Sequence, residues 1–445
     1  MYCLRSRTMV LVLMFTVLFS ILMGRTQAAT SEQYEYINIS DPFLNKTPIA
    51  VPRFKSFTKS ETETKSGARA LEILRAGLNF TGYLKVMDST AFLSDPAVSG
   101  IQLGQIVFKD WTSIGAELLI TGGIEEIQGQ VKLRLRLFDT YNTKLLVGKI
   151  YTGTPSQIRK MIHMFCAEVS KALTGNSGVF DTRLTFVSTV DGKKEIFVSE
   201  FDGYNPKQIT QHQSISLSPS WSSDGRWLAY VSYAGGKPDI FMARLGEKGR
   251  AVVGYNGINI SPDWMPGQLK IAATLSFSGN QQIYLLTLKG EIIKKITNSW
   301  GINVSPRFSP DGRKIAFTSS RSGTPQIYVK DLASGEVKRV TFEGVYNTSP
   351  SWSPDGQKIA YVGIDKRKIN IFTIPINPEP GIPTQLTKNA GSNEDPCWSK
   401  DGNLIVFKSD REGGRAKLFV MTAVGTDQRR LISLKGEQSQ PDWSK

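Results

Sequence analysis

The pattern of apolar and polar residues falls into short segments that return at a nearly constant spacing over more than half of the chain. Residues 306–341 show the unit, in which four segments rich in β-branched and aromatic side chains are separated by glycine-bearing turns. The first turn reads Pro310-Asp311-Gly312-Arg313, and its glycine accepts a positive φ. This unit predicts a four-stranded β-meander. One repeat has Met265-Pro266-Gly267-Gln268 instead, so we expect another turn geometry there.

Each repeat begins with a proline that is followed two residues later by an aromatic residue. The prolines are 43, 44, 44, 46 and 45 residues apart, which is the length of a propeller blade. Residues 184–210 match the last three strands of a repeat, and a lone first strand stands at residues 440–443. Pairing these two segments would complete one more blade and hide two sheet edges. The pattern therefore predicts a six-bladed β-propeller over residues 179–445. The signature segments are Ser218–Trp221, Ser261–Trp264, Ser305–Phe308, Ser349–Trp352, Asp395–Trp398 and Gln440–Trp443.

The residues before the repeats predict a different domain. Apolar residues at helical spacing indicate two helices, of which the second should end at Gly175, and one predicted strand alternates strictly between apolar and polar residues. We expect a compact α/β domain over residues 45–175, followed by the linker Asn176-Ser177-Gly178. The predicted strands are residues 48–51, 84–87, 117–121, 131–137 and 144–150, and the predicted helices are residues 65–77 and 158–173.

The first residues have the order of a secretory signal peptide. Met1–Arg7 is basic, Met9–Met23 is apolar and uncharged, and Thr26–Ala29 offers small residues for cleavage. An uncleaved signal anchor is the alternative, because the apolar run approaches the length of a membrane span. We expect residues 1–29 to be a signal peptide and residues 30–44 to be a mobile N-terminal segment. No transmembrane segment is expected after cleavage.

The net charge bears on the possible partners, and the cysteine content bears on whether disulfides are expected. The net charge is +15, and loss of three arginines with the signal peptide leaves +12. In an exported protein this excess favours anionic surfaces or an acidic partner, or it serves solubility alone, and it does not indicate nucleic acid. Cys166 and Cys397 fall in different domains, so we expect two buried free thiols and no disulfide framework.

No motif in the sequence indicates catalysis. The two histidines, His163 and His212, stand alone, and a lone histidine is usually packed or solvated. The sequence has no paired-histidine motif, no phosphate-binding glycine loop and no Gly-x-Ser-x-Gly. We therefore predict no enzyme activity, no cofactor and no metal. An exported propeller hydrolase or glycan-binding protein is the alternative, and it would need carboxylates that converge in the channel.

Three positions before each signature proline the chain has a short polar residue. In a six-fold register these side chains would surround one mouth of the central channel. Alternatively, asparagine shapes the turn that leads into the strand. Both interpretations can hold together, because binding residues concentrate on rigidly held loops. The residues are Ser216, Asn259, Asn303, Asn347, Asn393 and Gln438.

Taken together, these features resemble the TolB family, the periplasmic components of the Tol-Pal system. The resemblance rests on the order of domains and on Ser-Pro-x-Trp-Ser-x-Asp-Gly repeats of the WD40-like (PD40) kind. It also rests on Leu173-Thr174-Gly175 at the domain junction and on Phe201-Asp202-Gly203-Tyr204-Asn205 in the incomplete repeat at residues 184–210. It implies a periplasmic, non-enzymatic connector that maintains outer-membrane integrity and acts in cell division. It also implies a monomer outside the complex.

The resemblance further implies two protein partners. The lipoprotein Pal would bind the channel mouth of the propeller, and the inner-membrane protein TolA would bind the N-terminal segment. Mapped onto this sequence, the Pal surface would be Ile258, Asn259, Asn303, Val304, Asn347, Thr348, Asn393 and Glu394. The TolA-binding segment would be Glu35, Tyr36, Ile37, Asn38, Ile39 and Ser40.

Overall fold

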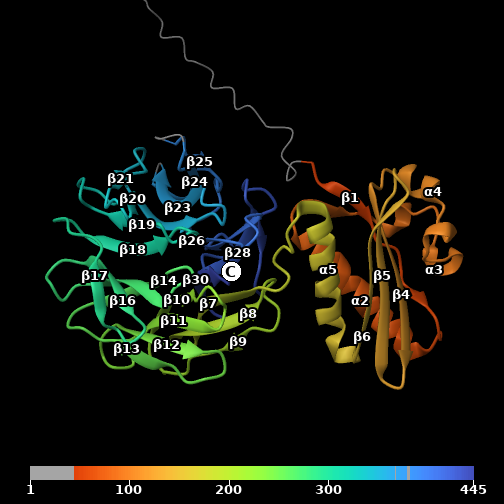
Figure 1. Ribbon diagram of the computed structural model, residues 1–445, viewed down its shortest axis with the longest axis horizontal. Helices are drawn as coiled ribbons and strands as arrows, with labels where there is room; N and C mark the ends of the chain where they lie inside the picture. The colour runs from red at the N-terminus through yellow and green to blue at the C-terminus, as the bar shows by residue number, and fades with distance from the viewer. Residues whose placement is uncertain (1–44, 366, 378–380, 445) are drawn as a thin grey trace, which may run out of the picture. The chain divides into compact units, whose positions relative to one another are not determined.

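The computed structural model describes residues 45–365, 367–377 and 381–444. An α/β region comes first and six four-stranded sheets follow it, as predicted (Figure 1). The described residues belong to one compact unit. The predicted signal peptide and the predicted TolA-binding residues Glu35–Ser40 lie outside the described residues.

The α/β region is built on a sheet with the strand order β3-β1-β4-β5-β6, and β2 also pairs with β4. β1 runs parallel to β3 and β4, whereas β4, β5 and β6 form an antiparallel meander. Alternate residues of β5 are buried, which confirms the alternation seen in the sequence. The strands are β1 (Thr47–Ala50), β2 (Lys55–Ser56), β3 (Leu84–Val86), β4 (Leu118–Ile127), β5 (Gln130–Asp139) and β6 (Lys144–Gly153).

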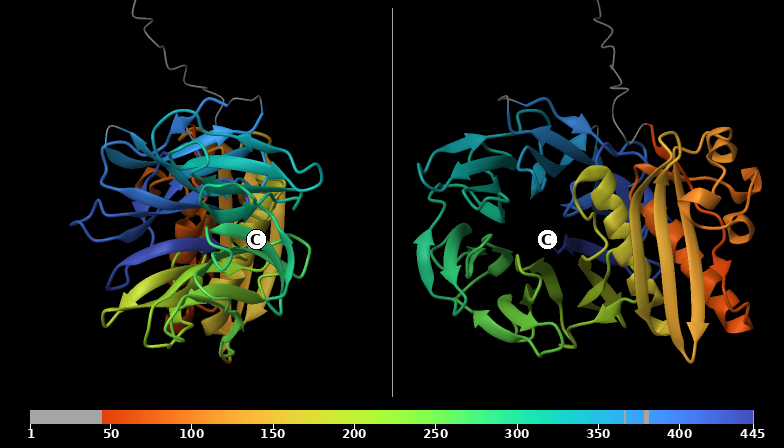
Figure 2. Two further views of the ribbon diagram at one scale, coloured as in Figure 1. Left: turned by 90° about the vertical axis from the view of Figure 1, so that its left-hand side faces the viewer. Right: turned by 45° about the vertical axis from the view of Figure 1, so that its right-hand side comes forward.

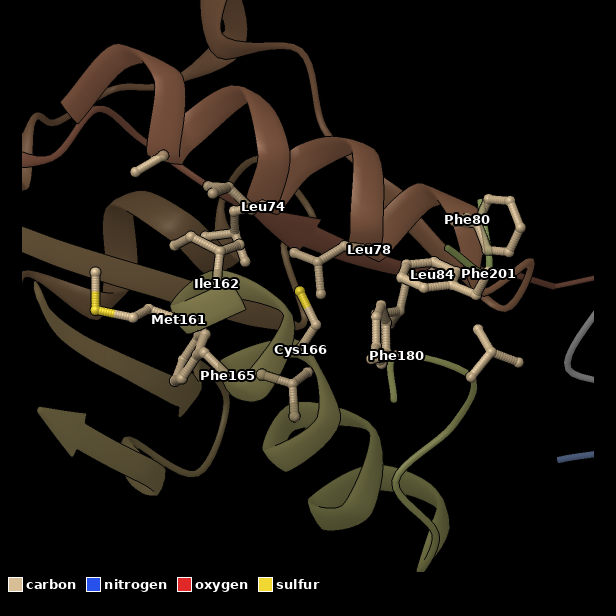
Figure 3. Packing of buried hydrophobic residues seen from close by; sticks show 14 of the residues in the cluster. Leu74, Leu78, Phe80, Leu84, Met161, Ile162, Phe165, Cys166, Phe180 and Phe201 are labelled. Carbon is tan, nitrogen blue, oxygen red and sulfur yellow. The ribbon is translucent and has the colours of Figure 1, made fainter. Parts of the chain in front are cut away.

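Two long helices, α2 (Glu61–Phe80) and α5 (Ile158–Thr174), pack on one face of this sheet. The Ser60 side chain caps α2 by accepting a hydrogen bond from Glu63 N. Gly175 ends α5 with a φ of 82°, as predicted. Figure 3 shows the side chains of the two helices interleaving. The short helices are η1 (Ser89–Ala91), α3 (Pro96–Ser99), η2 (Leu103–Gln105), α4 (Phe108–Thr112) and η3 (Pro155–Gln157).

The six remaining sheets follow one another around a common axis (Figure 2). Five blades take four consecutive strands each, and the sixth has the order β30-β7-β8-β9. The predicted split blade is therefore confirmed. Blade 1 is β10 (Ser216–Trp221), β11 (Trp227–Ser232), β12 (Asp239–Arg244) and β13 (Arg250–Val253). Blade 2 is β14 (Asn259–Trp264), β15 (Lys270–Leu275), β16 (Gln282–Thr287) and β17 (Ile292–Lys295). Blade 3 is β18 (Asn303–Phe308), β19 (Lys314–Ser319), β20 (Gln326–Asp331) and β21 (Val337–Arg339). Blade 4 is β22 (Asn347–Trp352), β23 (Lys358–Asp365), β24 (Lys368–Pro375) and β25 (Thr384–Gln385). Blade 5 is β26 (Asn393–Trp398), β27 (Leu404–Ser409), β28 (Lys417–Thr422) and β29 (Arg429–Arg430). Blade 6 is β30 (Gln438–Trp443), β7 (Arg183–Val190), β8 (Lys193–Glu200) and β9 (Lys207–Gln208).

A bulge in each innermost strand explains how the strand tolerates its proline. The pairing register jumps across the signature residues, for example between Val304 and Arg307. The residue before each proline has a φ between 49° and 54° in all six blades. Proline has no N–H to give to a ladder, so its place in an unpaired bulge costs the sheet no hydrogen bond.

The predicted exception among the hairpin turns also has its own geometry. In the common turn, Gly312 is the fourth residue, has a φ of 68° and donates its N–H to Ser309 O. In the exceptional turn Gln268 N donates to Met265 O, so Gly267, also at 68°, is the third residue. Positive φ at the third position is the mark of a type II turn.

The helix α5 joins the α/β region to blade 6. Arg159 binds Glu200 at 2.7 Å and Asp202 at 2.5 Å, and its guanidinium lies 3.9 Å from the centre of the Tyr204 ring. The rings of Phe80 and Phe201 meet edge to face at 5.1 Å (Figure 3). The hydrophobic core of the α/β region therefore continues into the propeller without a break.

Closure of the ring generates the first prediction. Trp443 is 3% exposed and its indole donates to the Thr182 hydroxyl at 2.7 Å. Replacing Trp443 with alanine should lower the free energy of unfolding by about 3–5 kcal/mol, and deleting Ser439–Lys445 should give aggregation-prone protein. Trp300→Ala is the matched control, because Trp300 is 73% exposed. Urea melts check the substitutions, and equal stability losses for the two tryptophans would contradict the assignment.

The contact between α5 and blade 6 predicts a dependence of stability on pH. Burial, followed by the charge of Arg159, lowers the pKa of His163 to about 4; Glu200 lies 3.8 Å away but is already engaged by Arg159. In the unfolded chain His163 becomes protonated near pH 6.5, whereas in the folded protein it stays neutral down to about pH 4. The free energy of unfolding should therefore fall as the pH drops from 6.5 to 4, by on the order of 3 kcal/mol. His163→Gln should flatten this part of the curve in melts at stepped pH. An unchanged slope in the variant would assign the acid sensitivity to other groups.

Candidate functional site

The candidate site is the mouth of the propeller at which the six innermost strands begin. One residue before each strand has the same backbone contact in every blade, because its carbonyl accepts an N–H from the neighbouring hairpin at 2.9–3.3 Å. The backbone is thus fixed at six equivalent points. We call these residues the mouth ring; they are Ile215, Ile258, Ile302, Tyr346, Ser392 and Glu437.

Several large apolar side chains on this mouth are exposed to solvent. In the mouth ring, Ile215, Ile302 and Tyr346 are 44%, 47% and 43% exposed. The loops around them add the exposed side chains of Phe277, Trp300, Phe342 and Val345. A concentration of exposed apolar surface on a rigid backbone is typical of a protein-binding site.

The amides predicted to surround the mouth are buried. Asn259, Asn303 and Asn393 have no exposed surface and Asn347 is 2% exposed. Each donates its side-chain NH₂ to a carbonyl of the loop just before its strand, such as Tyr255 O at 2.8 Å. The geometry therefore favours the interpretation in which the amides shape these loops. A direct contact between these side chains and a partner does not fit their burial.

Two of the buried amides also hold arginines near the mouth. Asn303 Oδ1 accepts from Arg321 at 3.0 Å, and Asn393 Oδ1 accepts from Arg411 at 2.7 Å. Each guanidinium lies over two aromatic rings of its blade. Burial lowers the pKa of both arginines, although an arginine stays charged at neutral pH. Asn303 and Asn393 therefore position the side chains of Arg321 and Arg411 in addition to the loops before their strands.

The structure brings the other predicted mouth residues to the same end of the channel. Ile258 belongs to the mouth ring, and Val304, Thr348 and Glu394 follow the buried amides on their strands and are half-buried. Glu394 pairs with Lys408 at 2.9 Å. Ile302 and Tyr346 were not predicted as mouth residues from the sequence, although an apolar residue stands immediately before the polar position in four consecutive repeats.

Below the mouth the channel is narrow and polar. Its cavity of about 130 Å³ is lined by the signature prolines and the residues before them. Arg307 crosses it and binds Asp263 and Asp442, each at 3.2 Å. Burial opposes the charge of Arg307, but the two carboxylates outweigh it and raise its pKa. Burial raises the pKa of Asp395 in the same wall. These carboxylates were not predicted from the sequence.

At the far end the channel opens into a cavity of about 270 Å³ lined by the signature aromatic residues, among them Trp264 and Trp398. Cys397 lies in its wall, and both Cys166 and Cys397 are buried, as predicted. Within residues 45–365, 367–377 and 381–444, no group of histidine, cysteine, aspartate and glutamate side chains is placed to hold a metal ion. No helix in these ranges is long and apolar enough to cross a membrane.

The fold defines a protein with an N-terminal α/β region and a six-bladed β-propeller. Residues 35–146 match the TolB amino-terminal domain family, and residues 170–445 match the TolB beta propeller domain family. The chain therefore belongs to the TolB family.

Individual relatives agree with this assignment. The chain is 50% identical to the Tol-Pal system protein TolB of Desulfosudis oleivorans over 55% of this chain and 56% of that protein. It is 40% identical to a TolB homolog of Chlorobium luteolum over 83% of this chain and 84% of that protein. The crystal structure of TolB from Acinetobacter baumannii matches with a TM-score of 0.79 and 28% identity, over 90% of this chain and 96% of that one.

Proposed function

We propose that this protein is a non-enzymatic periplasmic scaffold of the Tol-Pal system. In this role the propeller mouth binds the lipoprotein Pal and the N-terminal segment binds TolA, and the connection maintains outer-membrane integrity and supports cell division. Membership of the TolB family across both domains supports the role. The observation that carries the mouth assignment is the exposure of Ile215, Ile302 and Tyr346 at positions where the backbone is held by hydrogen bonds.

The chemistry of the mouth suits a folded protein partner. Isoleucine and tyrosine side chains supply apolar area that a partner can cover, and the arginines Arg321 and Arg411 add donors beside it. Such a mixture of aromatic, aliphatic and arginine contacts is common in interface hot spots. Because the ring backbone is already ordered, binding would lose little conformational entropy there.

A propeller hydrolase acting on envelope glycans remains the rival function. The channel does contain carboxylates, and a carboxyl with a raised pKa such as Asp395 is the kind of group an active site uses. However, Asp263 and Asp442 are both tied to Arg307. Turnover of purified peptidoglycan or lipopolysaccharide by this protein, lost in Asp395→Asn, would support the rival; recovery of Pal from envelope extract supports the scaffold.

The Pal assignment predicts that the mouth ring carries affinity. The double variant Ile302→Ala and Tyr346→Ala should weaken binding of the soluble Pal domain at least tenfold, because two anchors of an interface are truncated. Melting should stay nearly unchanged, since both side chains are exposed. Ile292→Ala is the control, because Ile292 is an exposed isoleucine on the outer strand β17. Parent-like affinity of the double variant in calorimetry would place Pal elsewhere.

The buried amides should behave differently from the ring. Asn303→Leu removes the hydrogen bonds to Gly301 O and to Arg321, so both melting temperature and Pal affinity should fall. A variant that loses affinity without losing stability would show that Asn303 contacts Pal directly.

The TolA assignment predicts that the two partners bind independent parts of the chain. Deleting Glu35–Ser40 should abolish binding of the periplasmic part of TolA and leave Pal affinity at the mouth unchanged. Surface plasmon resonance with each partner in turn checks this. If the deletion leaves TolA affinity intact, the segment is not its binding site.

A further inference from the structure

The α/β region has an exposed edge strand. β6 ends the sheet and pairs only with β5 among the described strands. Its pairing register shifts once, opposite Leu137 and Phe138, and then runs unbroken from Val147 to Gly153. Gly148, Lys149, Ile150 and Thr152 are exposed. An edge of this length offers its free backbone groups to another strand unless charge, proline or a bulge protects it.

The usual protection is weak in this part of β6. No proline interrupts the strand, and its bulge lies before the unbroken stretch. The central lysine, Lys149, pairs with Glu168 of α5 at 3.1 Å. The stretch from Gly148 to Gly153 is therefore an edge at which a further strand can add.

A row of cations lies on the sheet face beside this edge. Lys132, Arg134 and Arg136 alternate with the buried leucines of β5, so all three lie on the face opposite α2 and α5. Arg134 binds Glu125 at 2.7 Å and lies over the Phe57 ring. Among the described residues, Nη1 of Arg136 is buried without a hydrogen-bond partner. A buried guanidinium N–H without an acceptor is costly, so Arg136 would gain from an anionic partner.

The residue between Arg136 and the edge is a glycine. Gly148 pairs directly with Arg136, and a Cβ built there would meet only Leu145, at 3.6 Å. A strand added to β6 would lie about 10 Å from β5, twice the usual spacing of strands. A glutamate on the added strand and the long side chain of Arg136 can together span that distance across the open position.

Charge decides between the possible occupants of the edge. A second copy of the chain would place a second set of Lys149 and Arg136 side chains against the first, and like charges across a sheet are destabilising. An extended acidic segment would instead supply the missing acceptor. We infer that β6 is a docking edge for an acidic, extended segment of a partner protein, which adds as a strand and places a carboxylate on Arg136.

This site is separate from the propeller mouth and does not depend on the proposed Pal or TolA contacts. Side chains on the arginine face of the added strand would lie next to Gly148, Ile150 and Thr152. We therefore expect an acidic residue beside Gly148 and an apolar residue two positions away, beside Ile150, which is 59% exposed.

The test uses the full chain and three labelled peptides. The first is an acetylated octapeptide in which threonine alternates with glutamate and valine. The second has lysine in place of glutamate, and the third keeps the glutamates but has proline at two central threonines, which removes backbone donors. Fluorescence anisotropy at low ionic strength should show binding of the first peptide, at least tenfold weaker binding of the proline peptide and no binding of the lysine peptide.

Variants of the protein locate the site. Arg136→Gln and Gly148→Val should each weaken binding of the acidic peptide about tenfold. Gly148→Val should leave the melting temperature unchanged, because a valine side chain fits an exposed strand. Arg136→Gln should not lower the melting temperature, because it removes a buried N–H that has no acceptor. Lys207→Gln is the matched control, since it removes one exposed charge from the propeller strand β9. Equal binding of the acidic and proline peptides, or parent-like affinity in Arg136→Gln, would overturn the inference. So would a dimer in sedimentation that Gly148→Val dissociates, because the edge would then serve a second copy.

Discussion

The pairing of β30 with β7 is the interaction on which the rest of the propeller depends. It joins residues more than two hundred positions apart, from Gln438 opposite Ser188 to Trp443 opposite Leu184. Without it, blade 6 loses its innermost strand and blades 1 and 5 lose a neighbour on that side. Contacts across the channel wall reinforce the closure, because Asp442 accepts the N–H of Trp221 in blade 1 at 2.8 Å. The closed ring of six blades therefore depends on this pairing, and the closed ring holds the loops of the mouth in place.

The links between adjacent innermost strands are not identical from blade to blade. In three blades the side chain after the signature proline accepts the backbone N–H of the signature aromatic residue in the next blade. Asp263 accepts from Phe308 and Asp442 accepts from Trp221. Cys397 Sγ accepts from Trp443 N at 3.3 Å. Elsewhere the tryptophan indole donates to a backbone carbonyl, as Trp264 does to Ser220 O. Arg307 then neutralises the two carboxylates that this arrangement places in the channel. The channel chemistry follows from how each pair of blades is joined.

The sequence predicted the blades and their order because spacing and turn chemistry repeat, and the split blade followed from the incomplete repeat at 184–210. Channel carboxylates such as Asp263 stand at a position whose residue type changes from one repeat to the next, so the repeat pattern did not reveal them.

The buried amides show a second limit of the prediction from sequence. Asn303 is a polar residue next to a loop, and only the three-dimensional path of that loop, which curls back so that Gly301 O meets the amide, decides that it points inward. The same loop path turns the Ile302 side chain outward. From the pattern of apolar residues alone, Ile302 would have been assigned to the core.

The two proposed sites, the mouth and the β6 edge, would recognise a protein in different ways. At the mouth the carbonyls of the six ring residues are already hydrogen-bonded within the propeller, so exposed side chains such as Ile302 and Tyr346 would supply the contacts to a partner. At β6 the free backbone edge supplies most of the attraction, and Arg136 and Gly148 select the charge of the incoming strand. The first mode needs a partner with a complementary folded surface, whereas the second accepts a segment that has no fold of its own. Because α5 packs on the same sheet and binds blade 6 through Arg159, a strand added to β6 would stiffen the element that also contacts the propeller. The two proposed surfaces are therefore connected through α5 and its contact with blade 6.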